Sequence, residues 1–159
     1  MIIKGLEECD VVNYRKTSMF ISFPSCTFKC EKECGEHCCQ NSALAQTPNI
    51  DVGVKAIVNK YINNPITSAI VIGGLEPFDS EQDLLTLITY LRDSTQDDII
   101  IYTGFTKEEL QDGETYKSLL RFKNIIIKFG RYIPHQQPHY DPVLGINLAS
   151  ENQYAEVIS

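Results

Sequence analysis

The segment "SAIVIGG", Ser68 to Gly74, is a short, continuous apolar run that ends in two glycines. A run of this kind is typical of a β-strand buried on both faces, and the paired glycines predict a turn after it. Apolar residues recur at helical spacing on both sides of this strand, over residues 52–62 and 80–94. The sequence around Ser68 therefore predicts a helix–strand–helix unit.

The same alternation extends along the rest of the chain. Three further apolar runs predict strands, at residues 17–23, 98–104 and 124–130. Two short amphipathic segments predict helices between the later strands, at residues 106–110 and 116–122. The predicted order is strand, cysteine-rich segment, helix, strand, helix, strand, helices and strand.

Polar residues mark the expected starts of the helices. Thr106 and Glu109 have the spacing of a capping box, in which two side chains satisfy the first backbone N–H groups reciprocally. For the two longer helices, the expected caps are Asp51 and either Asp79 or Ser80.

Apolar strands separated by amphipathic helices predict βαβ units, and therefore an α/β fold with a parallel sheet and flanking helices. The strands are too few for an eight-stranded barrel, so we expect an open, partial βα barrel. The length suits one domain over residues 1–159. Ligands of such sheets bind beyond the carboxyl ends of the strands. The cysteine-rich segment, Gly73–Gly74 and Thr103–Gly104 all fall at that edge.

The composition and charge of the chain indicate which kinds of partner and which compartment to expect. The formal net charge is −7, and the 14 Lys and Arg residues are scattered rather than arranged in a basic stripe. Nucleic acid is therefore not an expected partner. No apolar run approaches the roughly 20 residues that span a bilayer, and the start of the chain lacks the pattern of a signal peptide. We expect a cytoplasmic protein that does not bind membranes.

Five of the six cysteines lie within "SCTFKCEKECGEHCCQNS", Ser25 to Ser42. Disulfides, a structural zinc and an iron–sulfur cluster are the physical explanations for this density. A reducing compartment disfavours disulfides. Zinc is more often held by two ligand pairs separated by a spacer, although four thiolates in one short loop can also close on zinc. A cluster held by only three thiolates keeps an open iron position, where chemistry can take place.

These residues resemble a known family. The cysteine segment is similar to the cluster loop of radical S-adenosylmethionine (SAM) enzymes, whose pattern is C-x3-C-x2-C after the first strand. Over nearly the whole chain, the sequence resembles the small activating proteins of anaerobic ribonucleotide reductase. The matching segments, in order, are "DVVNYRKTSMFISFPSC" (10–26), "CQN" (39–41), "GGLEP" (73–77), "IYTGF" (101–105) and "LASENQ" (148–153).

The resemblance assigns cluster ligands with one departure. Cys26 and Cys30 match the first two ligands, but Glu33 stands where the third cysteine is expected. The following "CQN" makes Cys39 the best third ligand, which gives the spacing C-x3-C-x8-C. Two other cysteines remain rivals for this position, Cys34 and Cys38. A second departure is "KFGRY" (128–132), where the family often has an Asp-Gly pair.

The resemblance also implies an activity. A [4Fe–4S] cluster would bind SAM at its fourth iron and, once reduced, cleave it to a 5′-deoxyadenosyl radical. The implied fold is a partial barrel of the radical SAM type. The implied protein partners are a glycyl radical enzyme, the large subunit of anaerobic ribonucleotide reductase, and a reductant such as flavodoxin or ferredoxin. The residues expected to bind SAM are Gly73, Gly74, Glu76, Pro77, Tyr102, Thr103 and Asn41.

Two alternatives remain open at the level of the sequence. In the first, the radical SAM chemistry is the same but the target is another peptide or a small molecule. In the second, the protein is a non-enzymatic interaction module that a zinc ion stabilises. Iron and sulfide analysis separates the zinc module from both enzymes.

Overall fold

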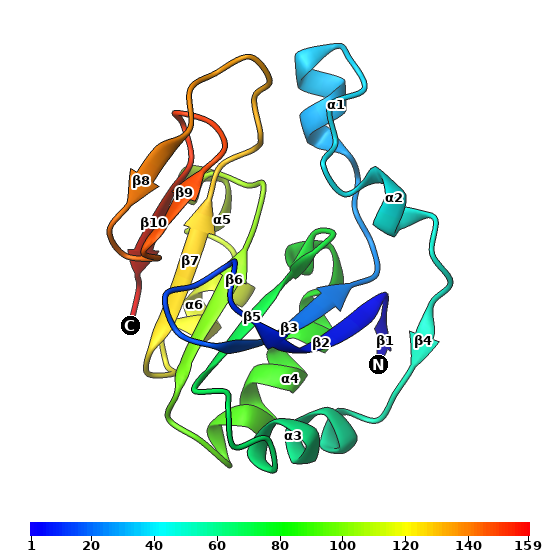
Figure 1. Ribbon diagram of the computed structural model, residues 1–159, viewed down its shortest axis with the longest axis vertical. Coiled ribbons are helices and arrows are strands. Elements are labelled where there is room, and N and C mark those ends of the chain that lie inside the picture. Colours follow the sequence, from blue (N-terminus) through cyan, green and yellow to red (C-terminus); the bar gives the residue numbers. More distant parts are fainter.

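Six strands form one mixed sheet in the computed structural model, which describes residues 1–159 (Figure 1). The strand order is β10–β7–β6–β5–β3–β2. The central strands are mutually parallel: β3 (Ser18–Phe23), β5 (Ala69–Gly74), β6 (Asp98–Tyr102) and β7 (Ile125–Phe129). These are the four strands that the apolar runs predict.

The two edges of the sheet differ from the prediction of a parallel sheet. Both β2 (Gly5–Asp10) and β10 (Tyr154–Val157) pair antiparallel with their neighbours. Neither edge strand has a continuous apolar run, because much of each remains in contact with solvent. A strand that is only partly buried does not require the apolar sequence that reveals a central strand.

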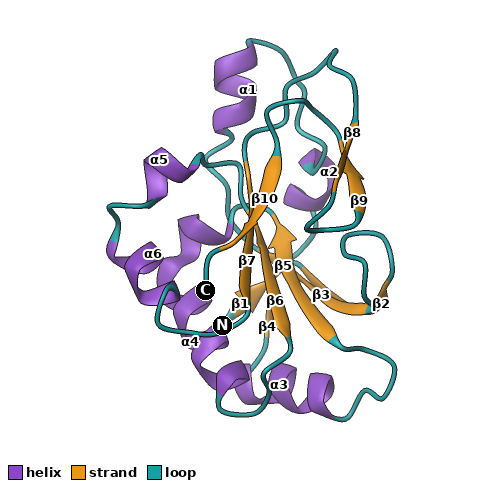
Figure 2. Ribbon diagram, turned by 90° about the vertical axis from the view of Figure 1, so that its left-hand side faces the viewer, coloured by secondary structure: helices purple, strands orange, loops and turns teal.

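Four of the helices between the parallel strands cover one face of the sheet (Figure 2). They are α3 (Val54–Ile62), α4 (Glu81–Arg92), α5 (Lys107–Leu110) and α6 (Glu114–Leu119). Apolar side chains of α3 and α4 pack against alternate residues of the strands, such as Ile70, Ile72 and Ile99, in the larger core. No helix combines the length and the apolar character needed to cross a membrane.

The opposite face of the sheet has a second, smaller core. Val71, Ile100 and Ile126 point to this face and pack with Tyr14 and Leu144. The covering elements are the segment after β2 and the hairpin of β8 (His139–Asp141) and β9 (Ile146–Leu148). Burial on both faces explains why the central strands are apolar without alternation.

The remaining elements are short. A two-residue pairing joins β1 (Ile2–Ile3) to β4 (Ile50–Asp51), and the cysteine segment contains α1 (Lys29–Cys34) and α2 (Ser42–Ala45). Neither α1 nor α2 contains a buried residue. The segment between β7 and β8, residues 130–138, contains no helix or strand, and β8 begins at His139.

The structure confirms the capping box of Thr106 and Glu109, with both of its hydrogen bonds present. Of the other two caps, Asp51 is wrong, and Ser80 has the expected position but not the expected side-chain bond. Gly53, not Asp51, is the cap residue of α3. Ser80 is the cap residue of α4 without a side-chain bond, and it is also the last residue of a 3₁₀ turn, η1 (Pro77–Ser80).

Candidate functional site

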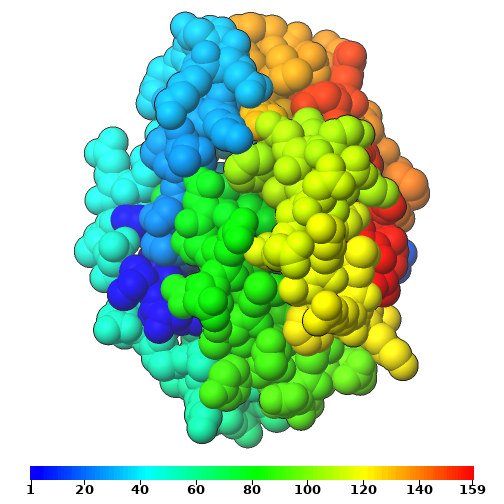
Figure 3. Space-filling model, turned by 180° about the vertical axis from the view of Figure 1, so that it is seen from behind, coloured from blue at the N-terminus to red at the C-terminus, as the bar shows by residue number.

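A cavity of about 360 Å³ opens beyond the carboxyl ends of the parallel strands. Its wall includes the residues that follow β3, β5, β6 and β7, together with part of β9 and the segment after β2. Seen from behind, the cysteine segment (blue) and the segment after β7 (orange) lie together at one end of the molecule (Figure 3). The cavity therefore occupies the edge of the sheet where the sequence predicts a ligand.

Three of the five loop cysteines line this cavity: Cys26, Cys30 and Cys39. The two rivals for the third position, Cys34 and Cys38, do not. Burial raises the pKa of Cys26 to about 11, and burial followed by the neighbouring Cys39 raises the pKa of Cys30.

The donor set fits an iron–sulfur cluster in chemistry, because three thiols share one cavity and clusters are held by thiolates. No three His, Cys, Asp or Glu side chains are gathered closely enough to form a ready-made metal site. The segment must therefore tighten around the metal as it binds, and metal binding must displace the thiol protons.

The start of the cysteine segment is fixed to the loop after β5. The Thr27 N–H donates to Asp79 Oδ2 at 2.8 Å, and the Glu76 N–H donates to the Ser25 carbonyl at 2.7 Å. Asp79 therefore anchors the cysteine segment instead of capping α4. These two bonds place Cys26 against the end of β5.

Gly74 lies at that end of β5 with φ +80°, in the left-handed region that favours glycine. A Cβ atom at this position would come within 2.8 Å of the Ser22 Cβ atom and 2.9 Å of its Cα atom. Gly74 lines the cavity, whereas Gly73 and Pro77 do not. Gly73 packs beneath the Phe20 and Tyr102 side chains, and Pro77 is buried in η1.

The Glu76 carboxylate is buried and accepts three hydrogen bonds. The donors are the Phe78 N–H at 3.1 Å, the Thr103 hydroxyl at 2.8 Å and the Gly104 N–H at 2.8 Å. Burial raises the pKa of Glu76 to about 7, although the three donors oppose this shift. Glu76 therefore joins the ends of β5 and β6 as well as lining the cavity.

Lys128 is a site residue that the sequence reasoning did not identify. It lines the cavity at 7% exposure, and its Nζ atom donates to the Gly130 carbonyl at 2.9 Å. Burial lowers the pKa of Lys128 to about 8. The sequence "NIIIKFG" could have indicated this residue, because a single lysine within an apolar, buried strand is unusual and suggests a functional role.

Tyr102 and Asn41 also line the cavity. The Tyr102 hydroxyl donates to the Asn13 carbonyl at 2.5 Å, which links β6 to the segment after β2. The Lys128 Nζ atom lies 5.9 Å from the centroid of the Tyr102 ring. Asn41 begins α2, but its side chain makes no capping hydrogen bond.

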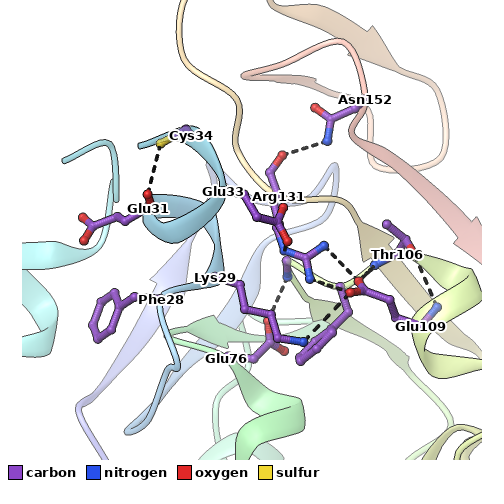
Figure 4. Close-up of polar contacts among 12 residues, drawn as sticks. Phe28, Lys29, Glu31, Glu33, Cys34, Glu76, Thr106, Glu109, Arg131 and Asn152 are labelled. Carbon is purple, nitrogen blue, oxygen red and sulfur yellow. Dashed lines mark hydrogen bonds and ion pairs between the residues drawn. The ribbon is translucent and has the colours of Figure 1, made fainter. Parts of the chain in front are cut away.

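An ion-pair network at the mouth of the cavity connects α1 to α5 (Figure 4). Arg131 donates to both carboxylate oxygens of Glu109, at 2.9 and 2.7 Å. The Arg131 Nε atom lies 3.3 Å from Glu33 on α1, and Lys29 lies 3.9 Å from Glu109. Glu33, which stands at the expected position of the third cysteine, thus contacts Arg131, which lines the cavity. These contacts were not foreseen because their residues are far apart in the sequence.

The tail segment "LASENQ" holds the loop after β7 in place. The Asn152 side chain donates to the Arg131 carbonyl at 2.8 Å, and the buried Gln153 side chain donates to the Gly130 carbonyl at 3.2 Å. Both acceptors lie next to the cavity.

Comparison with known proteins adds the identity of the domain. The sequence model of the 4Fe-4S single cluster domain family matches residues 15–154, which is most of the chain. No curated protein and no solved structure matches the chain. The matched region contains all five loop cysteines and every residue that lines the cavity except Val12 and Asn13. The chain therefore belongs to the family of 4Fe-4S single cluster domains, and an iron–sulfur cluster is its cofactor.

Proposed function

We propose that this iron–sulfur protein is a radical SAM enzyme that generates a glycyl radical on the large subunit of anaerobic ribonucleotide reductase. One observation carries the proposal: three of the five loop thiols share a cavity with the end of β5 and with Thr103, while the other two thiols do not. Those are the segments that resemble the activating proteins. The volume of about 360 Å³ lies in the range of small-molecule pockets.

In this proposal Cys26, Cys30 and Cys39 hold the cluster, so that one iron keeps an open position for SAM. When bound, the reduced cluster supplies the electron that cleaves SAM to methionine and a 5′-deoxyadenosyl radical. The remaining tasks of binding, orientation and exclusion of water belong to the residues of this chain.

Gly74 lets the backbone at the end of β5 enter the cavity wall without a side chain between it and the ligand. Glu76 and Lys128 place a carboxylate and an ammonium on the same wall. SAM carries the opposite charges on its methionyl amino and carboxylate groups, so this pair favours that end of the molecule. Because three protein donors already fix Glu76, its carboxylate needs no reorganisation when a ligand arrives.

The order of the parallel strands and the position of the helices support a partial βα barrel as the scaffold. The strands β3, β5, β6 and β7 lie side by side in the order in which they occur along the chain, and the helices α3, α4, α5 and α6 share one face. An open edge next to the cavity would admit a loop of the partner protein. Flavodoxin or ferredoxin is the proposed electron donor, in the cytoplasm.

The first experiment tests the chemistry. Anaerobic reconstitution should give about four iron and four sulfide per chain, and addition of SAM and dithionite should release 5′-deoxyadenosine, measured by mass spectrometry. Cys26→Ala, Cys30→Ala and Cys39→Ala should each lose the cluster, whereas Cys34→Ala and Cys38→Ala serve as matched controls that keep it. A zinc-loaded protein without sulfide, or a full cluster without SAM cleavage, would refute the enzyme assignment.

The second experiment tests the target. The reconstituted protein is mixed with the large reductase subunit, SAM and reduced flavodoxin, and a glycyl radical is sought by electron paramagnetic resonance. Formation of 5′-deoxyadenosine without a glycyl radical would move the assignment to a radical SAM enzyme with another peptide or a small molecule as its substrate.

A further inference from the structure

Cys34 and Cys38 are the two thiols of the cysteine segment that lie outside the cavity. Their Sγ atoms are 2.7 Å apart, and both residues are partly exposed. The sulfurs of a disulfide are about 2.05 Å apart, so an approach of less than about 1 Å would bring these two to bonding distance. The proposed function leaves both thiols unused.

Hydrogen bonds within the segment bring the two thiols together. Gly35 ends α1 with φ +74°, which turns the chain back at that point. The Glu31 carboxylate then accepts from the Cys39 N–H at 3.2 Å and lies 2.8 Å from His37 Nδ1. Glu31 thus holds the loop after α1 against the helix, with Cys38 beside Cys34 and Cys39 at the cavity.

We propose that Cys34 and Cys38 form a reversible disulfide that is separate from the cluster ligands. The oxidant is a small-molecule disulfide such as glutathione disulfide. One thiol loses its proton and attacks a glutathione sulfur, which breaks the glutathione S–S bond and releases one glutathione thiol. The second thiol loses its proton and displaces the other glutathione from the mixed disulfide. Two protein sulfurs are oxidised, two glutathione sulfurs are reduced, and the two protons pass to the released thiols.

The Cys34–Cys38 disulfide would restrict how far the third proposed cluster ligand, Cys39, can move from the second, Cys30. Eight residues separate Cys30 from Cys39, where the related pattern has two. A Cys34–Cys38 bond ties the end of α1 to the residue before Cys39, and this limits the movement of the third ligand relative to the second. The inference rests on the proposed ligand set, and its test has a readout that does not involve SAM.

The test is made on the cluster-loaded protein under anaerobic conditions. The protein is treated with glutathione disulfide, free thiols are alkylated, and the chain is cleaved after glutamate. Cleavage after Glu36 separates Cys34 from Cys38, so their disulfide would join two peptides that dithiothreitol separates again. Cys38 and Cys39 stay on one peptide, so the alkylated residue of that peptide identifies the bond. The expected result is this linked pair with the alkyl group on Cys39, unchanged iron content, and a several-fold slower loss of iron to a chelator than in the reduced protein. Cys9, which is exposed on β2, is the internal control and should gain only a glutathione adduct.

The variants Cys34→Ser and Cys38→Ser should retain the cluster, lose the linked peptides and lose iron at the rate of the reduced protein. The inference is overturned if no internal disulfide forms, if the disulfide includes a thiol of the cavity, or if either variant cannot hold iron. Failure of SAM cleavage would refute the proposed function but would leave the peptide and iron measurements as they stand.

Discussion

Replacing Lys128 by methionine should make the folded protein more stable at neutral pH, because the substitution removes a charge from a buried position. Lys128 is only 7% exposed, and its single protein acceptor is the Gly130 carbonyl. Burial lowers the pKa of Lys128 from 10.5 to about 8. At about 1.36 kcal/mol for each pKa unit, this difference corresponds to roughly 3 kcal/mol that the folded state loses by keeping the ammonium charged.

The pH dependence has a definite sign. Below pH 8 the ammonium is charged in both the folded and the unfolded chain, and the folded protein carries the whole penalty. Between pH 8 and 10.5 the folded protein gives up the proton first, so its stability rises with pH. Methionine loses the hydrogen bond to Gly130, which is worth about 1 kcal/mol. We therefore expect the variant to gain about 2 kcal/mol at pH 7, and to lose about 1 kcal/mol relative to the wild type once the lysine is neutral.

Urea unfolding of both metal-free proteins, followed by circular dichroism from pH 7 to 10.5, measures this difference. Lys123→Met is the matched control, because Lys123 is exposed and its replacement should change stability by less than about 0.5 kcal/mol throughout. A Lys128→Met protein that is less stable than the wild type at pH 7, or a difference that does not vary with pH, would refute the reasoning.

Three further substitutions test other parts of the site. Gly74→Ala should lower the free energy of unfolding by more than about 2 kcal/mol, because Gly74 has a positive φ and an added Cβ atom would clash with Ser22. The control is Gly53→Ala, whose Cβ atom meets no atom within 4 Å, and it should leave the free energy of urea unfolding almost unchanged. Arg131→Gln should lower stability by about 1 kcal/mol, with faster limited proteolysis of α1, and 1 M salt should narrow its difference from the wild type. Thr103→Val removes one donor to Glu76 and should raise the Glu76 pKa above its present value of about 7, measured by carbon-13 NMR. An unchanged titration would show that the hydroxyl does not stabilise the carboxylate.

The central strands and the longer helices could be predicted from the sequence because their buried positions are occupied by apolar residues. These residues are continuous in the strands and recur at helical spacing in the helices. Each isoleucine of "DIIIY" faces one of the two cores, so the run is apolar throughout. The edge strands could not be predicted in this way. In β2, "GLEECD", three consecutive residues are exposed, and their polar character hides the strand.

Some residues of the candidate site could likewise be predicted from local sequence, and others could not. The cysteines and Gly74 could be found because their types and spacing are unusual within short segments. The roles of Glu33, Lys29 and Arg131 depend on contacts between α1, α5 and the segment after β7, which no local pattern encodes. Asp79 was assigned to a helix start on local grounds, but a backbone N–H of the cysteine segment, 52 positions away, is its partner.

The absence of buried residues from α1 and α2 has a consequence for how the protein matures. Both apolar cores are complete without any side chain of these two helices. In a zinc finger the metal supplies the folding free energy, and the chain is unfolded without it. Here the sheet and both cores can form first, and the cysteine segment can receive iron and sulfide afterwards, as a late assembly step. A molecule that has lost its cluster would then keep both cores folded and could be loaded with iron and sulfide again.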